Sequence, residues 1–379
     1  MRLYYFFLSV YYFLKQIFIK KHYDVVFYAP SHFNRGDNHE NLYFKDLIAL
    51  CKNHNISYIY FEEPDIYNNQ MRSNDAIPFD FIYYLVIILR KFMGSEMSHI
   101  QTDMKIGNFI SKILFYNFSF SNYITLSQSM LSFFNGLNPK AKKFDLQHGT
   151  IHARKKSYLY DGIPSVNLLK NKTCLLLSGK GFKDLLVKND KTKYFINNSN
   201  IIGSSLNFLK SNTNKKEKLN KNILVSLQFT HDHTENENME IYNKLLNLIK
   251  IKSSFHFYLR HHPRYNNDFN LKKLLLLSNT SIINGNIYDN LSMCSFHLTT
   301  YSTIAFQASM YSIPTFFLKI KSPIMEIFDT QYEYPFFNYS LEDLYDNYDL
   351  CSIKVKEWAE DFYTSFSAKK FISILNYEK

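Results

Sequence analysis

Short apolar runs alternate with helix-like patterns through the first half of the chain. Near its start, apolar runs at residues 24–28 and 56–61 flank a segment, 42–53, whose apolar residues recur at helical spacing. This is the pattern of a βαβ unit, and its parallel strands are expected to place ligands at their carboxyl ends. Later apolar runs that end in glycine or polar residues continue the pattern, and they lie at 143–146, 173–177 and 201–202.

The same alternation restarts after a polar, lysine-rich segment, which is typical of a linker between domains. The sequence therefore predicts an α/β protein of two Rossmann-like domains. The predicted parts are an N-terminal helix over 1–22, a first domain over 23–206, the linker over 207–222, a second domain over 223–354, and a helical region over 355–379 that is a candidate to return to the first domain.

The strongest indication of a ligand site lies in residues 296–319. An apolar strand leads into five consecutive hydroxyl side chains, including Thr300, Ser302 and Thr303, and then into a helix and a second strand. Free backbone N–H groups at the start of a helix favour an anion, so the turn predicts a site for a phosphate-bearing ligand. We expect the strand at 296–298, the turn at 299–303, the helix at 304–311 and the second strand at 315–318.

Two further strand ends in the second domain carry polar side chains that suit a nucleotide. The segment RHHPR follows a predicted strand directly, and Pro263 disfavours helical geometry at His262, so this segment is a loop. Arg260 and His262 can donate to phosphate oxygens there, although a basic surface loop has the same composition. Gln228 opens the segment QFTHDH after another strand and is expected to line the donor pocket.

The QFTHDH segment also places His231 and His233 on either side of Asp232, a pattern compatible with a metal site. A protein metal site needs three or four convergent ligands. No partner motif accompanies this segment, so we predict no metal.

The first domain offers two candidates for a general acid or base. His148 lies in QHGT after a predicted strand, where Gly149 allows close backbone approach and an imidazole titrates near neutral pH. The carboxylates Glu62, Glu63 and Asp65 lie at the end of another strand, where one of them can deprotonate an acceptor hydroxyl. An ordinary loop histidine and a solvated acidic turn are the structural alternatives, and both stay open here.

The N-terminal segment is apolar and aromatic, and basic residues interrupt and close it. Residues 3–14 are almost wholly apolar, Lys15 follows, and Lys20 and Lys21 end the run. The segment is short for a transmembrane helix and has no small-residue cleavage site of a signal peptide. A basic helix rich in tyrosine and phenylalanine suits a membrane interface, and a first helix packed on the domain is the alternative.

The net charge of +11 is compatible with nucleic acid or with an anionic membrane as a partner. No zinc-ligand spacing, helix-turn-helix pattern or RNP-like motif is present in the sequence, so nucleic acid is not expected. The four cysteines are far apart and form no CxxC pair, which favours reduced thiols. We therefore expect a cytoplasmic protein, peripheral at the inner face of the cytoplasmic membrane.

Taken together, QHGT, GSS after a strand, VSLQ, RHHP and the hydroxyl-rich segment resemble bacterial surface-polysaccharide glycosyltransferases of the GT-B type. These are capsule and lipopolysaccharide enzymes, including transferases that use CMP-activated Kdo or sialic-type acids. The resemblance implies two Rossmann-like domains facing across a cleft, a CMP-linked donor, a glycan or lipid-linked acceptor, and no metal or other cofactor. It also implies that His262 with Pro263, and Ser302 with Thr303, contact the phosphate of the donor.

The chain departs from this family at two places. Gln307 stands where the family often has a glutamate, which alters how the ribose is held, and there is no acidic-acidic-glycine motif. The catalytic base is therefore open between His148, Glu63 and Asp65. The alditol-phosphate polymerases of teichoic acid synthesis have a similar motif series, so a CDP-alditol phosphotransferase with His148 as its base is one alternative. A non-catalytic scaffold at the membrane is the other.

Overall fold

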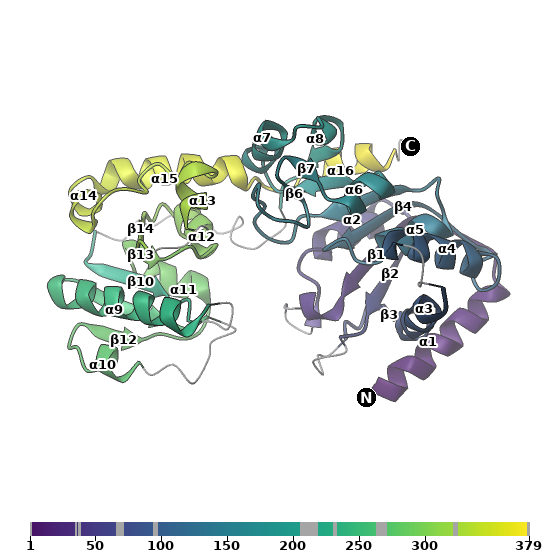
Figure 1. Cartoon of the computed structure of the whole chain (residues 1–379), viewed down its shortest axis with the longest axis horizontal. Coiled ribbons are helices and arrows are strands. Elements are labelled where there is room, and N and C mark those ends of the chain that lie inside the picture. Colours follow the sequence, from purple (N-terminus) through teal and green to yellow (C-terminus); the bar gives the residue numbers. More distant parts are fainter. Residues whose placement is uncertain are drawn as a thin grey trace. The chain divides into compact units, whose positions relative to one another are not determined.

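The chain forms two compact units (Figure 1). Unit 1 comprises Met1–Leu206 and Thr364–Lys379, and unit 2 comprises Asn207–Tyr363. The computed structural model describes residues 2–34, 36, 39–65, 72–93, 98–204, 219–229, 233–262, 271–320 and 325–376.

Unit 1 is built around a seven-stranded parallel sheet in the order β3-β2-β1-β4-β5-β8-β9. Because every strand runs in the same direction, all their carboxyl ends lie along one edge. The strands are β1 (Lys21–Pro30), β2 (Tyr58–Glu63), β3 (Ile77–Pro78), β4 (Phe118–Leu126), β5 (Lys142–Leu146), β8 (Cys174–Leu177) and β9 (Ser199–Ile201), and β6 (Leu159–Tyr160) pairs with β7 (Ile163–Pro164) as a separate hairpin.

Alternate residues of β1 serve two cores, one on each face of this sheet. Val26 and Tyr28 pack into an aromatic core with Phe13, whereas Val25 and Phe27 pack into a second core. Burial on both faces explains why the strands are continuous apolar runs. The helices of unit 1 are α1 (Arg2–Ile17), η1 (Ser31–Phe33), α2 (Lys45–Asn53), α3 (Asp80–Met93), α4 (His99–Ser111), α5 (Leu131–Leu137), α6 (Val166–Asn171), α7 (Lys180–Asn189), α8 (Tyr194–Asn197) and α16 (Ala368–Leu375).

Unit 2 holds a five-stranded parallel sheet in the order β12-β11-β10-β13-β14. Its strands are β10 (Asn222–Ser226), β11 (His256–Arg260), β12 (Thr280–Ile282), β13 (Phe296–Thr299) and β14 (Thr315–Phe317). Its helices are α9 (Glu235–Ile251), α10 (Lys272–Leu275), α11 (Ile287–Ser292), α12 (Ile304–Met310), α13 (Glu326–Thr330), α14 (Leu341–Asp346) and α15 (Tyr348–Phe362).

The C-terminal region changes units after α15. The Trp358 ring of α15 stacks on Phe306 of α12, with ring centroids 4.6 Å apart, so α15 belongs to unit 2. In unit 1, the backbone N–H of Ser367 donates to the carbonyl of Ile202 just before α16. The helical region expected over 355–379 is therefore two helices in two units.

The predicted elements of 296–319 are present with end shifts of one residue: β13 and β14 differ from the predictions at their last residue, and α12 ends at Met310 instead of residue 311. Among the helices that the structure describes, none combines the length and hydrophobicity that a membrane crossing needs.

Candidate functional site

The strand order of unit 2 reverses at the carboxyl ends of β10 and β13. From β10 the chain first builds outward through β11 and β12, and it then returns to place β13 on the other side of β10. In open parallel sheets, ligands bind where the strand order reverses in this way. The two loops at this point begin with Leu227 after β10 and with Thr300 after β13.

The side chain of Gln228 joins these two loops. Its Oε1 accepts a hydrogen bond from the backbone N–H of Tyr301 at 2.8 Å and lies 3.1 Å from the Thr299 hydroxyl. The Thr300 hydroxyl donates to the same oxygen. Gln228, Thr299 and Thr300 are all buried. One glutamine carbonyl therefore holds the shape of the hydroxyl-rich turn at the strand-order reversal.

The other hydroxyls of the turn have different surroundings. Ser302 is buried: its N–H donates to the Thr299 hydroxyl at 3.2 Å, and its own hydroxyl accepts from the Ile304 N–H at 3.3 Å. Thr303 is exposed at the start of α12. Thr299, Thr300 and Ser302 thus build the turn, whereas Tyr301 is half-buried and Thr303 is exposed to solvent.

Arg260 ends β11, directly beside β10. Its guanidinium donates to the Gly285 carbonyl at 2.9 Å and to the side chain of Asn290, so the loop after β12 fixes its position. Burial lowers the pKa of the neighbouring His261, which favours its neutral imidazole. His262 is half-buried, and Pro263 lies outside the described residues.

The QFTHDH segment contributes one described histidine to this site. The His233 ring lies edge-on to Tyr301 with centroids 5.5 Å apart, and its Nδ1 lies 3.2 Å from Asn238 Oδ1. His231 and Asp232 lie outside the described residues. Among the residues that are described, no group of three or more His, Cys, Asp or Glu side chains is placed to hold a metal ion.

A buried histidine that the sequence pattern did not single out lies on β13, the strand that leads into the turn. His297 on β13 bridges the Ser226 hydroxyl at 2.8 Å and the Thr315 hydroxyl at 3.0 Å. Burial lowers its pKa to about 3, so the ring is neutral. Its one sequence signal is a polar residue inside an apolar strand, and its contacts give it a structural role across β10, β13 and β14.

In unit 1, Glu62 belongs to a buried ion-pair network. The Arg72 guanidinium donates to Glu62 Oε1 at 3.3 Å and to both oxygens of Asp80 at 2.9 and 3.0 Å. Glu62 Oε2 accepts from Asn34 Nδ2 at 2.6 Å and from the Ser73 N–H at 3.1 Å. Burial raises the pKa of Glu62, and these donors act against that rise. The carboxylate is held in a structural cluster, and we do not propose it as the base.

Glu63 is the next residue and has a different environment. Burial raises its pKa to about 7, and the Tyr28 hydroxyl and the Arg90 guanidinium act against this rise. A carboxyl group with this pKa can exchange a proton near neutral pH. Asp65 follows two residues later and is half-buried.

His148 lies at the carboxyl end of β5. Its ring packs edge-on to Phe33 with centroids 5.0 Å apart, and its carbonyl accepts from the Tyr43 hydroxyl at 2.8 Å. The adjacent Gly149 faces open space, because a Cβ there would meet no described atom within 4 Å. The order β2-β1-β4-β5 puts three strand spacings, roughly 14 Å, between the ends of β2 and β5. Glu63 and His148 therefore lie at different positions along the carboxyl edge of the sheet of unit 1.

Asp145 is a further buried carboxyl group, and the sequence pattern did not single it out. It precedes QHGT on β5, and its Oδ1 accepts from the Gln128 N–H at 2.8 Å. Burial raises its pKa to about 7. Between roughly pH 4 and 7 the unfolded chain ionises this group while the folded chain keeps it protonated, so its contribution to stability falls as the pH rises.

We expect the Asp145→Asn variant to lose part of the pH dependence of stability. Asparagine keeps the acceptor for Gln128 and does not ionise. The difference in Tm between pH 5 and pH 8, measured by thermal unfolding of both proteins, should be smaller for the variant, with a gain in Tm at pH 8. Parallel Tm profiles for the two proteins would contradict this assignment.

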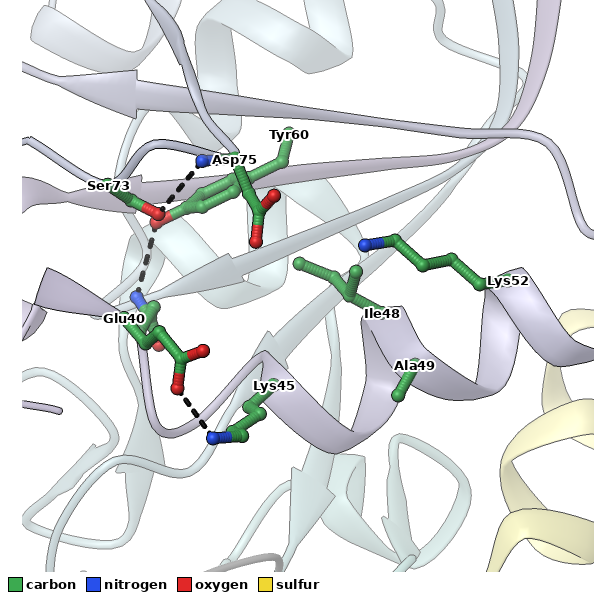
Figure 2. A pocket seen from close by; sticks show the side chains of 9 residues that line it. Glu40, Lys45, Ile48, Ala49, Lys52, Tyr60, Ser73 and Asp75 are labelled. Atoms are coloured by element: carbon green, nitrogen blue, oxygen red, sulfur yellow. Dashed lines mark hydrogen bonds and ion pairs between the residues drawn. The ribbon is translucent and has the colours of Figure 1, made fainter. Parts of the chain in front are cut away.

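A small polar pocket of about 160 Å³ lies between α2 and β2 (Figure 2). The Lys52 ammonium and the Asp75 carboxylate point toward the same space, whereas Lys45 is paired with Glu40. The Tyr60 hydroxyl lies 3.4 Å from Asn41 Nδ2 at its inner end. These charges suit a small polar group, and the pocket is a candidate subsite of unit 1.

Comparisons with known proteins bear on the fold. No protein-family model and no curated protein matches the chain. The UDP-GlcNAc 2-epimerase from Methanocaldococcus jannaschii, in complex with UDP-GlcNAc and UDP, is 13% identical, with a TM-score of 0.54 over 94% of this chain and 100% of that one. The epimerase from Neisseria meningitidis, bound to UDP-GlcNAc, is 12% identical, with a TM-score of 0.53 over 94% and 100%.

A variant of the wall teichoic acid polymerase TagF is also similar, at 13% identity and a TM-score of 0.52 over 98% of this chain and 96% of that one. Together with the two parallel sheets, these similarities decide the fold class. The fold is of the GT-B type. At these identities the likeness concerns the fold alone.

Proposed function

We propose that the protein is a glycosyltransferase that uses a nucleotide-activated sugar. The observation that carries this proposal is the Gln228 side chain, which shapes a hydroxyl-rich turn at the strand-order reversal of unit 2. In this proposal the turn and the segment from Arg260 to His262 receive the nucleotide and its phosphate. The fold neighbours support it, because two of them hold UDP-GlcNAc.

The proposed reaction transfers the sugar to a glycan or lipid-linked acceptor held by unit 1. A base at the edge of that sheet, His148 or Glu63 with Asp65 beside it, takes the proton of the attacking acceptor hydroxyl. The bond from the sugar to the donor phosphate breaks, and the phosphate keeps the electron pair. Arg260, His262 and Thr303 stabilise the negative charge on it. We propose that these groups serve in place of a metal ion.

The identity of the nucleotide is a separate question. The resemblance in sequence favours a CMP-linked Kdo or sialic-type donor for capsule or lipopolysaccharide synthesis. The fold neighbours named above are a wall teichoic acid polymerase and enzymes that act on UDP-GlcNAc. We propose the CMP-linked donor and choose an experiment that separates the alternatives.

The test is a thermal-shift series with CMP, CDP, UDP, UMP, GDP and ADP, each with and without Mg²⁺. A ligand at a hundredfold excess over its Kd stabilises the folded state by about 2.7 kcal/mol, and we expect CMP to raise the Tm without Mg²⁺. His262→Ala should abolish that rise. Preference for CDP, with a phosphodiester product, would favour the alditol phosphotransferase. The absence of any nucleotide shift would overturn the proposal in favour of the scaffold.

A further inference from the structure

Helix α1 is apolar on its outer face as well as on its inner face. Inside, the Phe13 ring packs on Phe61 and Phe115, with centroids 5.6 and 5.3 Å apart. Outside, a helical stripe that includes Tyr4, Phe7 and Tyr11 is largely exposed, and Phe18 directly after the helix is 84% exposed. A helix that is apolar all round is normally covered on every side. We therefore expect another surface to cover the outer stripe of α1.

Helix α3 and the connection between α4 and β4 present further exposed aromatic rings. The Phe6 ring of α1 contacts Tyr84 of α3, and Phe92 two turns further along α3 is 80% exposed. The Asn117 side chain, directly before β4, donates to the carbonyl of Ile17 at 2.6 Å, and the adjacent Tyr116 is 65% exposed. Figure 1 shows α1 and α3 at the outer edge of unit 1. We call the exposed side chains of α1, α3 and α4 with their flanking residues the aromatic face.

The segments that carry the aromatic face also carry exposed lysines. Lys15, Lys20 and Lys21 are exposed along and after α1, and α3 and α4 contribute exposed Lys91, Lys105 and Lys112. The described carboxylates of the three helices are Asp80 and Asp103, and ion pairs with Arg72 and Arg90 hold them. Lysines around exposed tyrosine and phenylalanine rings match the chemistry of an anionic lipid surface, where rings enter the headgroup layer and ammonium groups meet phosphates.

We propose that the aromatic face docks unit 1 on an anionic membrane, with α1 lying in the plane of the interface. Tyrosine and phenylalanine rings on a helix with lysines suit the headgroup layer, and the one-sided positive charge opposes a second copy of the same face. The proposal stands independently of the proposed function, because it concerns binding to lipid and not turnover.

The test is co-sedimentation of the full chain with vesicles. The probe is phosphatidylcholine with about one third phosphatidylglycerol, and pure phosphatidylcholine is the comparison. We expect binding to the anionic vesicles that weakens with salt. Changing Phe7, Tyr11 and Phe18 together to serine should weaken binding about 10- to 100-fold. Changing Lys15, Lys20 and Lys21 to glutamine should weaken it by about fivefold per lysine.

A matched control uses exposed apolar residues elsewhere. Ile251→Ser with Leu276→Ser alters two exposed aliphatic side chains of unit 2 and should leave vesicle binding unchanged. Because all the altered side chains are exposed, the variants should keep the Tm of the parent. Equal binding of the serine variant and the parent, or no binding by either, would overturn the proposal. So would a lipid-free dimer, seen by light scattering, that the serine variant dissociates.

Discussion

The Arg72→Met variant is expected to lose about 3–5 kcal/mol of unfolding free energy, because it leaves two buried carboxylates without their cation. Arg72 donates to Glu62 and to both oxygens of Asp80, and all three side chains are buried. Either carboxylate can escape the cost only by taking up a proton. The loss should therefore be smaller near pH 4, where protonation is easy, and should grow as the pH rises towards 7.

Denaturant unfolding of the parent and the variant at pH 4.5 and pH 7 measures this effect. Arg90→Met is the matched control, because it breaks another arginine–carboxylate pair, with Asp103, and the Arg90 side chain is 35% exposed. We expect a loss of only about 1 kcal/mol there. Similar losses of unfolding free energy in the two variants would show that the Arg72 cluster stabilises the fold no more than the Arg90–Asp103 pair does.

The Gln228→Leu variant is expected to bind the donor nucleotide at least about tenfold more weakly, because the turn loses the acceptor that holds it. Leucine has a similar length but no carbonyl. The Tyr301 N–H and the hydroxyls of Thr299 and Thr300 would lose their common partner. Restoring their hydrogen bonds requires the turn to move, and the phosphate contacts proposed for Thr303 would move with it.

Isothermal titration with the nucleotide selected by the thermal-shift series measures this loss. Gln147→Leu is the matched control in unit 1: that side chain also spans two loops, accepting from the Ser178 N–H at 2.9 Å and donating to the Gly149 carbonyl at 2.8 Å. The Gln147→Leu variant should lose about as much stability as Gln228→Leu and should keep its affinity for the nucleotide. Equal nucleotide affinity in the Gln228→Leu variant and the parent would remove the main support for the site in unit 2.

Local pattern was sufficient for several central elements of the fold. Short apolar runs predicted β10, β11 and β13, and the structure buries β10 and β13 at almost every position. The hydroxyl-rich turn was predicted from five consecutive hydroxyl side chains between an apolar run and a helical pattern, and the structure has it between β13 and α12. These features depend on neighbours in sequence, which one chain displays directly.

The partners of the site residues depended on contacts between distant positions. Gln228 and Thr300 are 72 residues apart, and they meet because β10 and β13 are neighbours in the sheet. Glu62 and Glu63 are adjacent in sequence, yet alternate strand residues face opposite sides, and one of them meets Arg72 while the pKa of the other rises to about 7. No local pattern separates them.

The sequence by itself therefore determined the α/β class, the two Rossmann-like halves and the strand ends at which polar side chains gather, because periodicity and turn residues act over a few positions. The tertiary structure alone decided which hydroxyls build the turn, which carboxylate is neutralised by an arginine, and which rings of the first helix remain exposed. Each of those outcomes depends on whether a side chain is buried and on which partner it meets there. Contacts between distant parts of the chain decide both, and spacing along the chain does not.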